Sequence, residues 1–223
     1  MPNKNIVEAY HTRLESPLTD SEFNRLMDMI PDDVQKRVLE EEGWENQHGS
    51  LARKILLLQA MKEFGVNVAE LFHSLKRMPS GKPYIEGGPH FSVANDGGVA
   101  VCVVSKTSVL GVDVERMKPI NLSEYREMMT FQEWREIYSH MIPLQRFYEF
   151  WTIKESVVKA DGEHKNIDIK EIYIQPDVAF CNAKYWYINP LELNYYGYLA
   201  YMVCSNPHAE IEYHQVNLAE VKL

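Results

Sequence analysis

Cysteine is scarce in this sequence, with three residues among 223. Cys102, Cys181 and Cys204 lie far apart, and none has the Cys-x-x-Cys or Cys/His spacing of a zinc site. The count therefore excludes a disulfide scaffold and disfavours structural zinc. An odd number of separated cysteines is typical of a reducing compartment, so we expect a cytoplasmic protein.

Long apolar runs are also missing. No stretch approaches the ~18 apolar residues that a membrane-spanning helix needs, and the opening MPNKNIVEAYHTRLES lacks the apolar core of a signal peptide. We therefore expect no membrane association. The hydrophobic content of 45% and the charged content of 25% are those of an ordinary globular protein.

Basic residues are also fewer than acidic ones. The chain has 23 Lys and Arg residues against 32 Asp and Glu residues, which gives a formal net charge of -9. Sequence-independent binding to nucleic acid needs an excess of basic residues, so no nucleic-acid partner is expected. The length allows one large domain or two small ones.

Two segments predict long helices. Residues 50–64, SLARKILLLQAMKEF, begin at a capping Ser50, end before Gly65 and are apolar on nearly all sides, which favours burial between layers. A second helix covers residues 147–162, with Pro143 before it and Gly162 at its end. Shorter helices are predicted after Thr19, after Pro31 and over 131–140.

The remaining segments predict strands. Residues 5–13 form a first candidate, and the apolar runs between His90 and Glu115 are joined by a polar turn at Lys106-Thr107, which indicates a hairpin. Four more strand-like segments follow the second long helix, separated by Pro or Asn. Strands and helices do not alternate as βαβ units, so we predict an α+β fold.

Each half of the chain holds one long apolar helix and at least two long strand segments. This favours two similar lobes, each a small, mostly antiparallel sheet packed on a long helix. We place an N-terminal lobe at 1–107 and a C-terminal lobe at 108–223, with the functional site in the cleft between them.

Three carboxylates stand out beside this boundary. Asp113 and Glu115 are two apart in an apolar strand, so their side chains point the same way, and Glu155 lies on the second long helix. Oxygen ligands of this kind suit Mg²⁺ that holds phosphates. On the helix, Trp151, Glu155 and Lys159 share one face. The competing interpretation is a core helix with an exposed Glu–Lys pair.

Gly111 to Glu115, followed by the W-x-x-K-E-S-x-x-K pattern, resembles the two signature motifs of the 4′-phosphopantetheinyl transferase superfamily. The spacing and the total length are similar to those of the larger, monomeric Sfp-type enzymes, which have holo-acyl-carrier-protein synthase activity. The likeness runs mainly from Ser80 to Gly162. The second motif comprises Trp151, Lys154, Glu155, Ser156 and Lys159.

The resemblance implies two α+β lobes with coenzyme A in the cleft. It implies transfer of phosphopantetheine from coenzyme A to a serine of an acyl or peptidyl carrier protein, with release of 3′,5′-ADP by a monomer. Asp113, Glu115 and Glu155 would hold Mg²⁺. Glu155 could also act as the base, and Lys159 would contact the leaving phosphate.

For the other contacts to coenzyme A, this chain matches the family at some positions and departs from it at others. Lys82 and Pro83 match the Gly-Lys-Pro that the family places near the adenine, and Lys154 could assist Lys159. Where the family has Ser-His-Ser after a Phe, this chain has Ala94, Asn95 and Asp96 after Phe91. Asn95 is a neutral donor in place of the histidine that helps to hold the 3′-phosphate.

Further departures bear on the same phosphate. Asp96 would bring a negative charge near it, and the basic residue that the family places before the Ser50 helix has no match. The candidates to replace that basic residue are Arg53, Lys54, Lys36 and Lys82. After the central helix, the segment EHKN replaces the Gly-rich continuation of the family.

Two other functions remain open from the sequence. A non-catalytic relative would bind a carrier protein or a nucleotide without transfer. A Mg²⁺-dependent hydrolase of pyrophosphate bonds would use the same carboxylates with water as the nucleophile. The complete carboxylate set argues against the first, because a protein without catalysis has no need to place like charges together.

Overall fold

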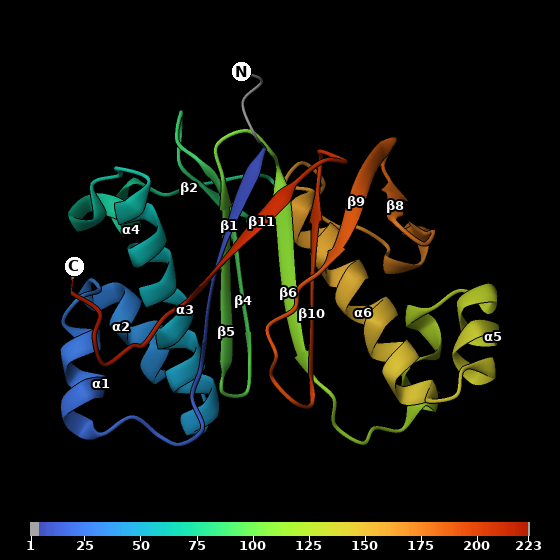
Figure 1. Ribbon diagram of the computed structural model, residues 1–223, viewed down its shortest axis with the longest axis horizontal. Helices are drawn as coiled ribbons and strands as arrows, with labels where there is room; N and C mark the ends of the chain where they lie inside the picture. Colours follow the sequence, from blue (N-terminus) through green and yellow to red (C-terminus); the bar gives the residue numbers. More distant parts are fainter. Residues whose placement is uncertain (1–4, 223) are drawn as a thin grey trace.

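The computed structural model describes residues 5–222, so residues 1–4 and 223 of the two predicted lobes lie outside the described part. Two sheets lie side by side at the centre, with helices on both outer sides (Figure 1). The predicted α+β class is confirmed. No helix within residues 5–222 has the length and apolar composition of a membrane-spanning segment.

The first sheet has four strands in the order β11-β1-β5-β4. Strand β1 pairs parallel with β11, and the other pairings of this sheet are antiparallel. Its strands are β1 (Ile6–Arg13), β4 (His90–Asp96), β5 (Val99–Ser105) and β11 (Glu210–Gln215).

The second sheet has five antiparallel strands in the order β6-β10-β9-β8-β7. Its members are β6 (Leu110–Arg116), β7 (Tyr173–Ile174), β8 (Val178–Cys181), β9 (Lys184–Pro190) and β10 (Tyr198–Cys204). A two-stranded ribbon of β2 (Lys76–Arg77) and β3 (Pro83–Tyr84) completes the strands of the described residues.

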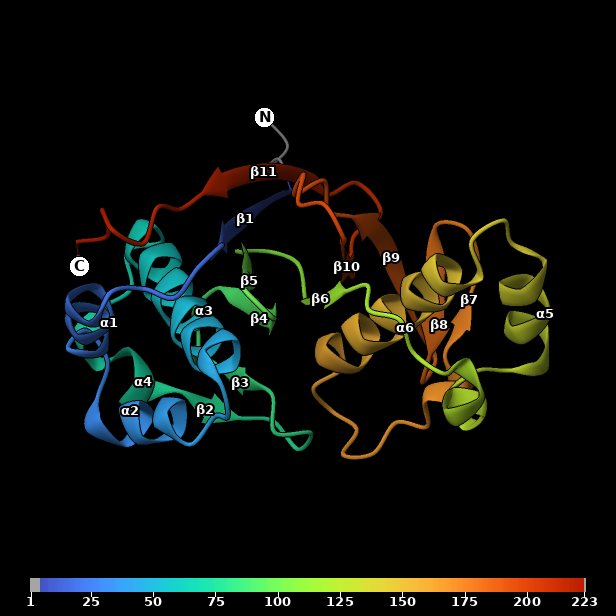
Figure 2. The ribbon, with the colours of Figure 1, turned by 90° about the horizontal axis from the view of Figure 1, so that it is seen from below.

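The helices divide between the two outer faces (Figure 2). The first group comprises α1 (Asp20–Met27), α2 (Asp32–Leu39), α3 (Trp44–Glu63), a 3₁₀ turn (Val68–Glu70) and α4 (Leu71–Ser74). The second group comprises a 3₁₀ segment (Leu122–Met128), α5 (Phe131–Ser139), α6 (Pro143–Ala160) and a 3₁₀ turn (Ile169–Glu171). The helices predicted after Thr19 and over 131–140 are confirmed, and each begins with a capping box, at Thr19 and at Thr130.

The long helices begin earlier than predicted. Helix α3 starts at Trp44, after Gly43 with a φ of 79°, so the predicted cap Ser50 is a buried interior residue. Helix α6 starts at Pro143, whose fixed φ and missing N–H suit the first helical position. Sequence analysis did not predict the first turns of α3, because the segment before Ser50 is polar. It did not predict the first turn of α6, because that turn begins with Pro143.

The predicted hairpin across Lys106-Thr107 is wrong. The hairpin forms one strand earlier, between β4 and β5, where Gly97 takes a φ of 51° after Asp96. An Asp-Gly-Gly turn accommodates such positive φ values at low cost, which Lys106-Thr107 does not. Strand β6 then enters the second sheet, although it still packs beside β4.

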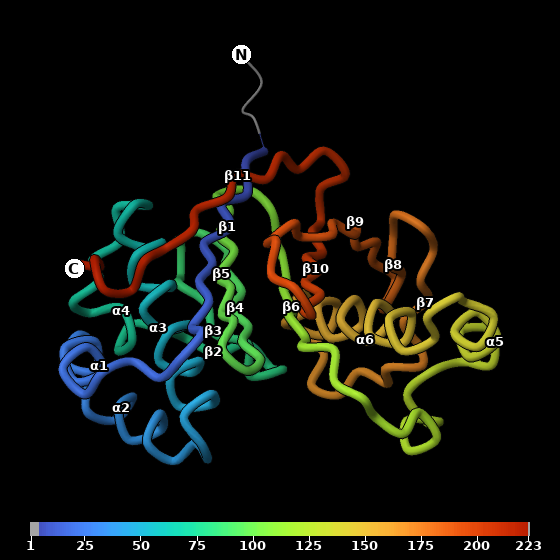
Figure 3. Tube along the Cα trace, turned by 60° about the horizontal axis from the view of Figure 1, so that its bottom comes forward, coloured from blue at the N-terminus to red at the C-terminus, as the bar shows by residue number. Residues whose placement is uncertain are grey.

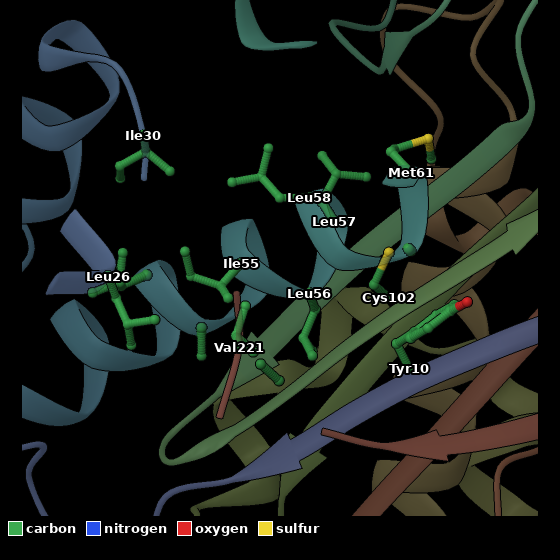
Figure 4. Close-up of a cluster of buried hydrophobic side chains, with 14 of the residues drawn as sticks. Tyr10, Leu26, Ile30, Ile55, Leu56, Leu57, Leu58, Met61, Cys102 and Val221 are labelled. Carbon is green, nitrogen blue, oxygen red and sulfur yellow. The ribbon is translucent and has the colours of Figure 1, made fainter. Parts of the chain in front are cut away.

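Strand β5 packs against other elements on both of its faces. Its residues are buried on both faces, as expected for a continuous apolar run. Ala100, Cys102 and Val104 face a cluster with α1–α3, part of which Figure 4 shows. Val99, Val101 and Val103 face a second cluster that includes residues of β6 and β10. The lobes therefore share a continuous apolar layer.

The division into lobes at 107 and 108 stays a prediction, and the C-terminal segment crosses that division. Strand β11 returns from the second half and pairs with β1 at the edge of the first sheet, as the path of the C-terminal segment in Figure 3 shows. Leu218 and Val221 are buried in the cluster under α3. Sequence pattern alone does not reveal this return, because strand pairing depends on the tertiary fold.

Candidate active site between the two lobes

Helix α6 packs closely on strand β6 because Gly111 has no side chain. A Cβ at Gly111 would lie 2.1 Å from the Ser156 carbonyl oxygen and 2.4 Å from the Ala160 nitrogen. Real Cβ atoms do not approach backbone atoms so closely. Because Gly111 lacks a Cβ, α6 can pack close to β6. This spacing determines how near the carboxylates of β6 lie to that of α6.

Asp113 and Lys159 form the contact between these two elements. Lys159 Nζ lies 2.5 Å from Asp113 Oδ1, and the Asp113 side chain is 8% exposed. Its other oxygen, Oδ2, is buried and has no hydrogen-bond partner among the described residues. Burial raises the pKa of Asp113, and the Lys159 ammonium opposes this rise without cancelling it. The Asp113 carboxylate could therefore take a further positive charge beside that of Lys159.

Glu115 is held by Trp151. The Trp151 indole Nε1 donates a hydrogen bond of 2.9 Å to Glu115 Oε1. Burial and the neighbouring charge of Asp113 raise the pKa of Glu115 to about 7, although the Trp151 bond lowers it. Trp151 therefore orients a carboxylate of the candidate site.

Glu155 lies half-buried on the face of α6 that also carries Trp151 and Lys159. Burial raises the pKa of Glu155, and the charge of Asp113 raises it further. Each of these carboxyls thus feels the field of Asp113. Glu115 and Glu155 are thus coupled electrostatically to Asp113, and the role of the three residues as metal ligands stays a prediction.

The three carboxylates do not form a complete set of metal ligands. Within residues 5–222, no three His, Cys, Asp or Glu side chains stand in a ligating cluster. The Lys159 ammonium contacts Asp113, and Trp151 contacts Glu115, so two of the oxygens are already engaged. The unpartnered Asp113 Oδ2 and the raised pKa values nevertheless fit a hard divalent cation, which would supply the missing charge.

Lys154 does not face the cleft, and its predicted role in binding coenzyme A is not supported. Its side chain is fully buried, and Nζ lies 2.8 Å from Glu133 Oε2 of α5. Lys154 precedes Glu155 by one residue, so it points about 100° away around the helix. The pair therefore joins α5 to α6.

A cavity of about 230 Å³ lies beside Lys159, between the two lobes. Lys82 and Pro83 line it from the first lobe, and their predicted place near the nucleotide stays a prediction. Lys82 Nζ donates to the carbonyls of Leu110 and Ala160, and burial lowers its pKa to about 8. The other lining residues are Ser80, Phe91, Ser92, Val93, Val158, Lys159, His164, Lys165 and Ile167.

A second cavity, of about 850 Å³, lies between α2, α3 and the β2–β3 ribbon, and shares Pro83, Phe91 and Val93 with the first. Arg53 and Lys54 line it, and burial lowers the pKa of Arg53 and lowers that of Lys54 to about 7. Both are therefore well placed to meet an anion.

Lys36, the remaining basic candidate, is exposed on α2 and does not line this cavity. Its neighbour Arg37 does, although Arg37 is also paired with Asp33 of the same helix. Sequence analysis missed Arg37 because helix phase decides which of two adjacent exposed basic residues borders the cavity.

Asn95 and Asp96 lie at the end of β4 and do not line the first two cavities. Asn95 packs on α3, where a Cβ at Gly49 would lie 2.9 Å from its Nδ2. Asp96 Oδ2 accepts a hydrogen bond from the Arg116 backbone N–H, and Lys118 Nζ lies 3.6 Å from Oδ1. Asp96 is thus directed to the end of β6, so its charge does not face a phosphate in either cavity.

The chain is similar to known proteins over the segment that holds these residues. The sequence model described as "4'-phosphopantetheinyl transferase superfamily" matches residues 109–195, which include the three carboxylates and Lys159. The 4'-phosphopantetheinyl transferase ffp of Bacillus subtilis is 25% identical over 174 residues, 76% of either chain. The gsp enzyme of Aneurinibacillus migulanus is 23% identical, covering 76% of this chain and 71% of that one. Sfp of Bacillus subtilis strain 168 is 22% identical over 76% of both.

Proposed function

Because this chain belongs to the 4′-phosphopantetheinyl transferase superfamily, we propose that it is an Sfp-type enzyme that uses coenzyme A and Mg²⁺. It would transfer 4′-phosphopantetheine to a serine of an acyl or peptidyl carrier protein. The observation that carries this proposal is the contact of Asp113 with Lys159, which lines a cavity together with Lys82. Burial raises the pKa of Asp113 and of the two neighbouring carboxyls, Glu115 and Glu155.

In this reaction the serine oxygen forms a bond to the β-phosphorus of coenzyme A. The bond from that phosphorus to the bridging oxygen breaks, and 3′,5′-ADP leaves with the electron pair. Mg²⁺, when held by Asp113, Glu115 and Glu155, would neutralise charge on the pyrophosphate oxygens. The unpartnered Asp113 Oδ2 supports its binding there.

Glu155 is suited to accept the serine proton. A general base works best when its pKa lies near the working pH, and burial with the Asp113 charge raises that of Glu155. Lys159, one helical turn further on and 34% exposed, is placed to contact the leaving phosphate. Movement of its ammonium from Asp113 to the phosphate would free a carboxylate oxygen.

The two cavities support a position for the rest of coenzyme A. Pro83 lines both cavities and Lys82 lines the smaller one, while Arg53 and Lys54 supply positive charge in the larger one. We assign the nucleotide portion to this region, with Arg53 and Lys54 near its phosphate. The described cysteines are all free and buried, in keeping with our proposal of a cytoplasmic enzyme, and a monomer is expected.

The test is incubation of the purified chain with coenzyme A, Mg²⁺ and an apo carrier protein, followed by intact mass measurement. A gain of one phosphopantetheine on the carrier supports the proposal. Consumption of coenzyme A without that gain would indicate a pyrophosphate-bond hydrolase. Binding without either change would indicate a non-catalytic relative. Omission of Mg²⁺ is the matched control.

A further inference from the structure

The segment after α6, where EHKN departs from the family pattern, brings a histidine to the interlobe cavity. His164 lines this cavity together with Lys159, Lys82 and Lys165. Its Nδ1 lies 2.7 Å from Asp161 Oδ2. The carboxylate therefore fixes the orientation of the ring and leaves Nε2 as the nitrogen available to a ligand.

Asp161 is a rigid anchor for this ring. Its side chain is fully buried, and Asn182 Nδ2 donates to the same Oδ2 at 3.0 Å. The Glu163 backbone N–H donates to Oδ1 at 3.1 Å, and Lys184 Nζ lies 3.7 Å from it. Burial opposes ionisation of Asp161, but these hydrogen bonds and the lysine charge hold its pKa below the usual value.

The loop that carries His164 is also held against the first lobe. The Ser80 N–H donates to the Gly162 carbonyl at 3.2 Å, and the Met78 sulfur occupies the space that a Cβ at Gly162 would fill. These contacts hold the loop after α6 against the segment that precedes β3. His164 consequently stands at a defined place, although its side chain remains 45% exposed.

The cavity favours an anion, and His164 is one of its few uncommitted donors. The ammonium of Lys82 already donates to two carbonyls, and that of Lys159 contacts Asp113. In the part of the chain that the structure describes, neither Nε2 of His164 nor Nζ of Lys165 has a hydrogen-bond partner. A phosphate in the cavity would satisfy both.

We propose that His164 is a substrate-binding residue that donates a hydrogen bond from Nε2 to a phosphate oxygen of the phosphopantetheine donor, with Asp161 as its positioning residue. This inference rests on the proposed function. In the complex the ring lies between the Asp161 carboxylate and the phosphate, with one ring nitrogen toward each. His164 thereby compensates, from the second lobe, for the neutral Asn95 at the position where the family has a histidine.

The test measures coenzyme A affinity by calorimetry for the wild type, His164→Ala and His164→Gln. The alanine variant should raise Kd about tenfold, the lower end expected for a partly exposed charged hydrogen bond, and glutamine should lose less. Adenosine, which has no phosphate, should bind all three chains alike. In the transfer assay KM for coenzyme A should rise while kcat changes less than threefold.

His214 offers a matched control. Its Nε2 lies 2.5 Å from Glu8 Oε2, and its side chain is 42% exposed, but it lies in the first sheet away from this cavity. His214→Ala should leave coenzyme A affinity within twofold of the wild type. Asp161→Asn should weaken binding in the wild type and have much less effect in His164→Ala, as expected if Asp161 acts through the ring.

An unchanged Kd in His164→Ala, or an equal loss in the His214 control, would overturn the inference. If His164→Ala fails to fold, the ring signals of His164 in the wild-type NMR spectrum, assigned with His164→Gln, replace it. Those signals should shift on addition of 3′,5′-ADP, and the absence of a shift would also overturn the inference. Failure of the wild type to transfer phosphopantetheine would instead refute the proposed function.

Discussion

At the scale of single residues, the three carboxylates of the candidate site matter most. Asp113→Ala, Glu115→Ala and Glu155→Ala should each reduce turnover by at least ~10²-fold, because each removes a ligand or base that acts on developing charge. Steady-state transfer assays at saturating Mg²⁺ measure this effect. Glu149→Ala is the control, since Glu149 is a half-buried carboxylate of α6 paired with Arg146. If two of the three variants keep turnover within a few-fold, the metal assignment is wrong.

Lys159 should matter for turnover more than for folding. Lys159→Met should lower turnover at least ~10-fold, because it removes a charged hydrogen bond to the leaving phosphate. In saturating Mg²⁺ its melting temperature should stay close to that of the wild type, since a metal bound at the proposed site would compensate the charge of Asp113. Lys170→Met is a matched control, because Lys170 is 37% exposed and paired with Glu127. A Lys159→Met variant that melts earlier but keeps its specific activity would reveal a purely structural ion pair.

Glu115 should make stability depend on pH when divalent cations are absent. Its pKa of about 7 in the folded protein exceeds the ordinary 4.5, so the folded state retains the proton longer than the unfolded state. The contribution of Glu115 to stability therefore falls as pH rises from about 4.5 to 7. Glu115→Gln, which retains an acceptor for Trp151, should gain stability relative to the wild type over this range. Denaturant titrations in EDTA at pH 5 and pH 8 compare the two chains, and a pH-independent difference would contradict the expectation.

At the scale of elements, the contact between β6 and α6 decides whether the site forms. Gly111→Ala should destabilise the protein by roughly 3 kcal/mol or more, because a new Cβ would overlap the Ser156 carbonyl and the Ala160 backbone. It should also reduce turnover, since α6 can make room only by moving Glu155 and Lys159 away from Asp113. Chemical denaturation measures the first effect and the transfer assay the second.

Gly43→Ala provides the comparison for Gly111. A Cβ at Gly43 meets nothing within 4 Å, although its φ of 79° makes alanine unfavourable by about 1–2 kcal/mol. Its turnover should remain near that of the wild type. Equal losses of stability in the two variants would show that β6 and α6 can separate at little cost.

At the scale of the whole molecule, the two lobes should not fold independently. A fragment of residues 1–107 lacks β11, Leu218 and Val221, and it exposes the face of β5 that packs on the second sheet. We expect it to show no cooperative thermal transition by circular dichroism. Fragments 1–107 and 108–223 produced together should reassemble with such a transition. A cooperative transition in 1–107 alone would contradict this view of a shared core.

The sequence alone determined the local structure and the identity of the chemical groups. Helix caps at Thr19 and Thr130 form as predicted, because capping depends on residues three apart. The α+β class followed from periodicity, and the relation to a transferase family followed from two short motifs. Asp113, Glu115 and Glu155 could be selected because strand and helix periodicity determine which side chains share a face.

The tertiary structure alone decided which donors reach the cavities and how the lobes join. Lys154 and Lys36 carry suitable charge, yet helix phase turns one into a buried pair with Glu133 and leaves the other in solvent. His164 reaches the interlobe cavity because Asp161, Asn182 and the Ser80 loop meet there. Strand β11 joins the first sheet because it pairs with β1, which lies far from it in the sequence. Contacts between residues far apart in the chain depend on packing in three dimensions, which local sequence does not encode.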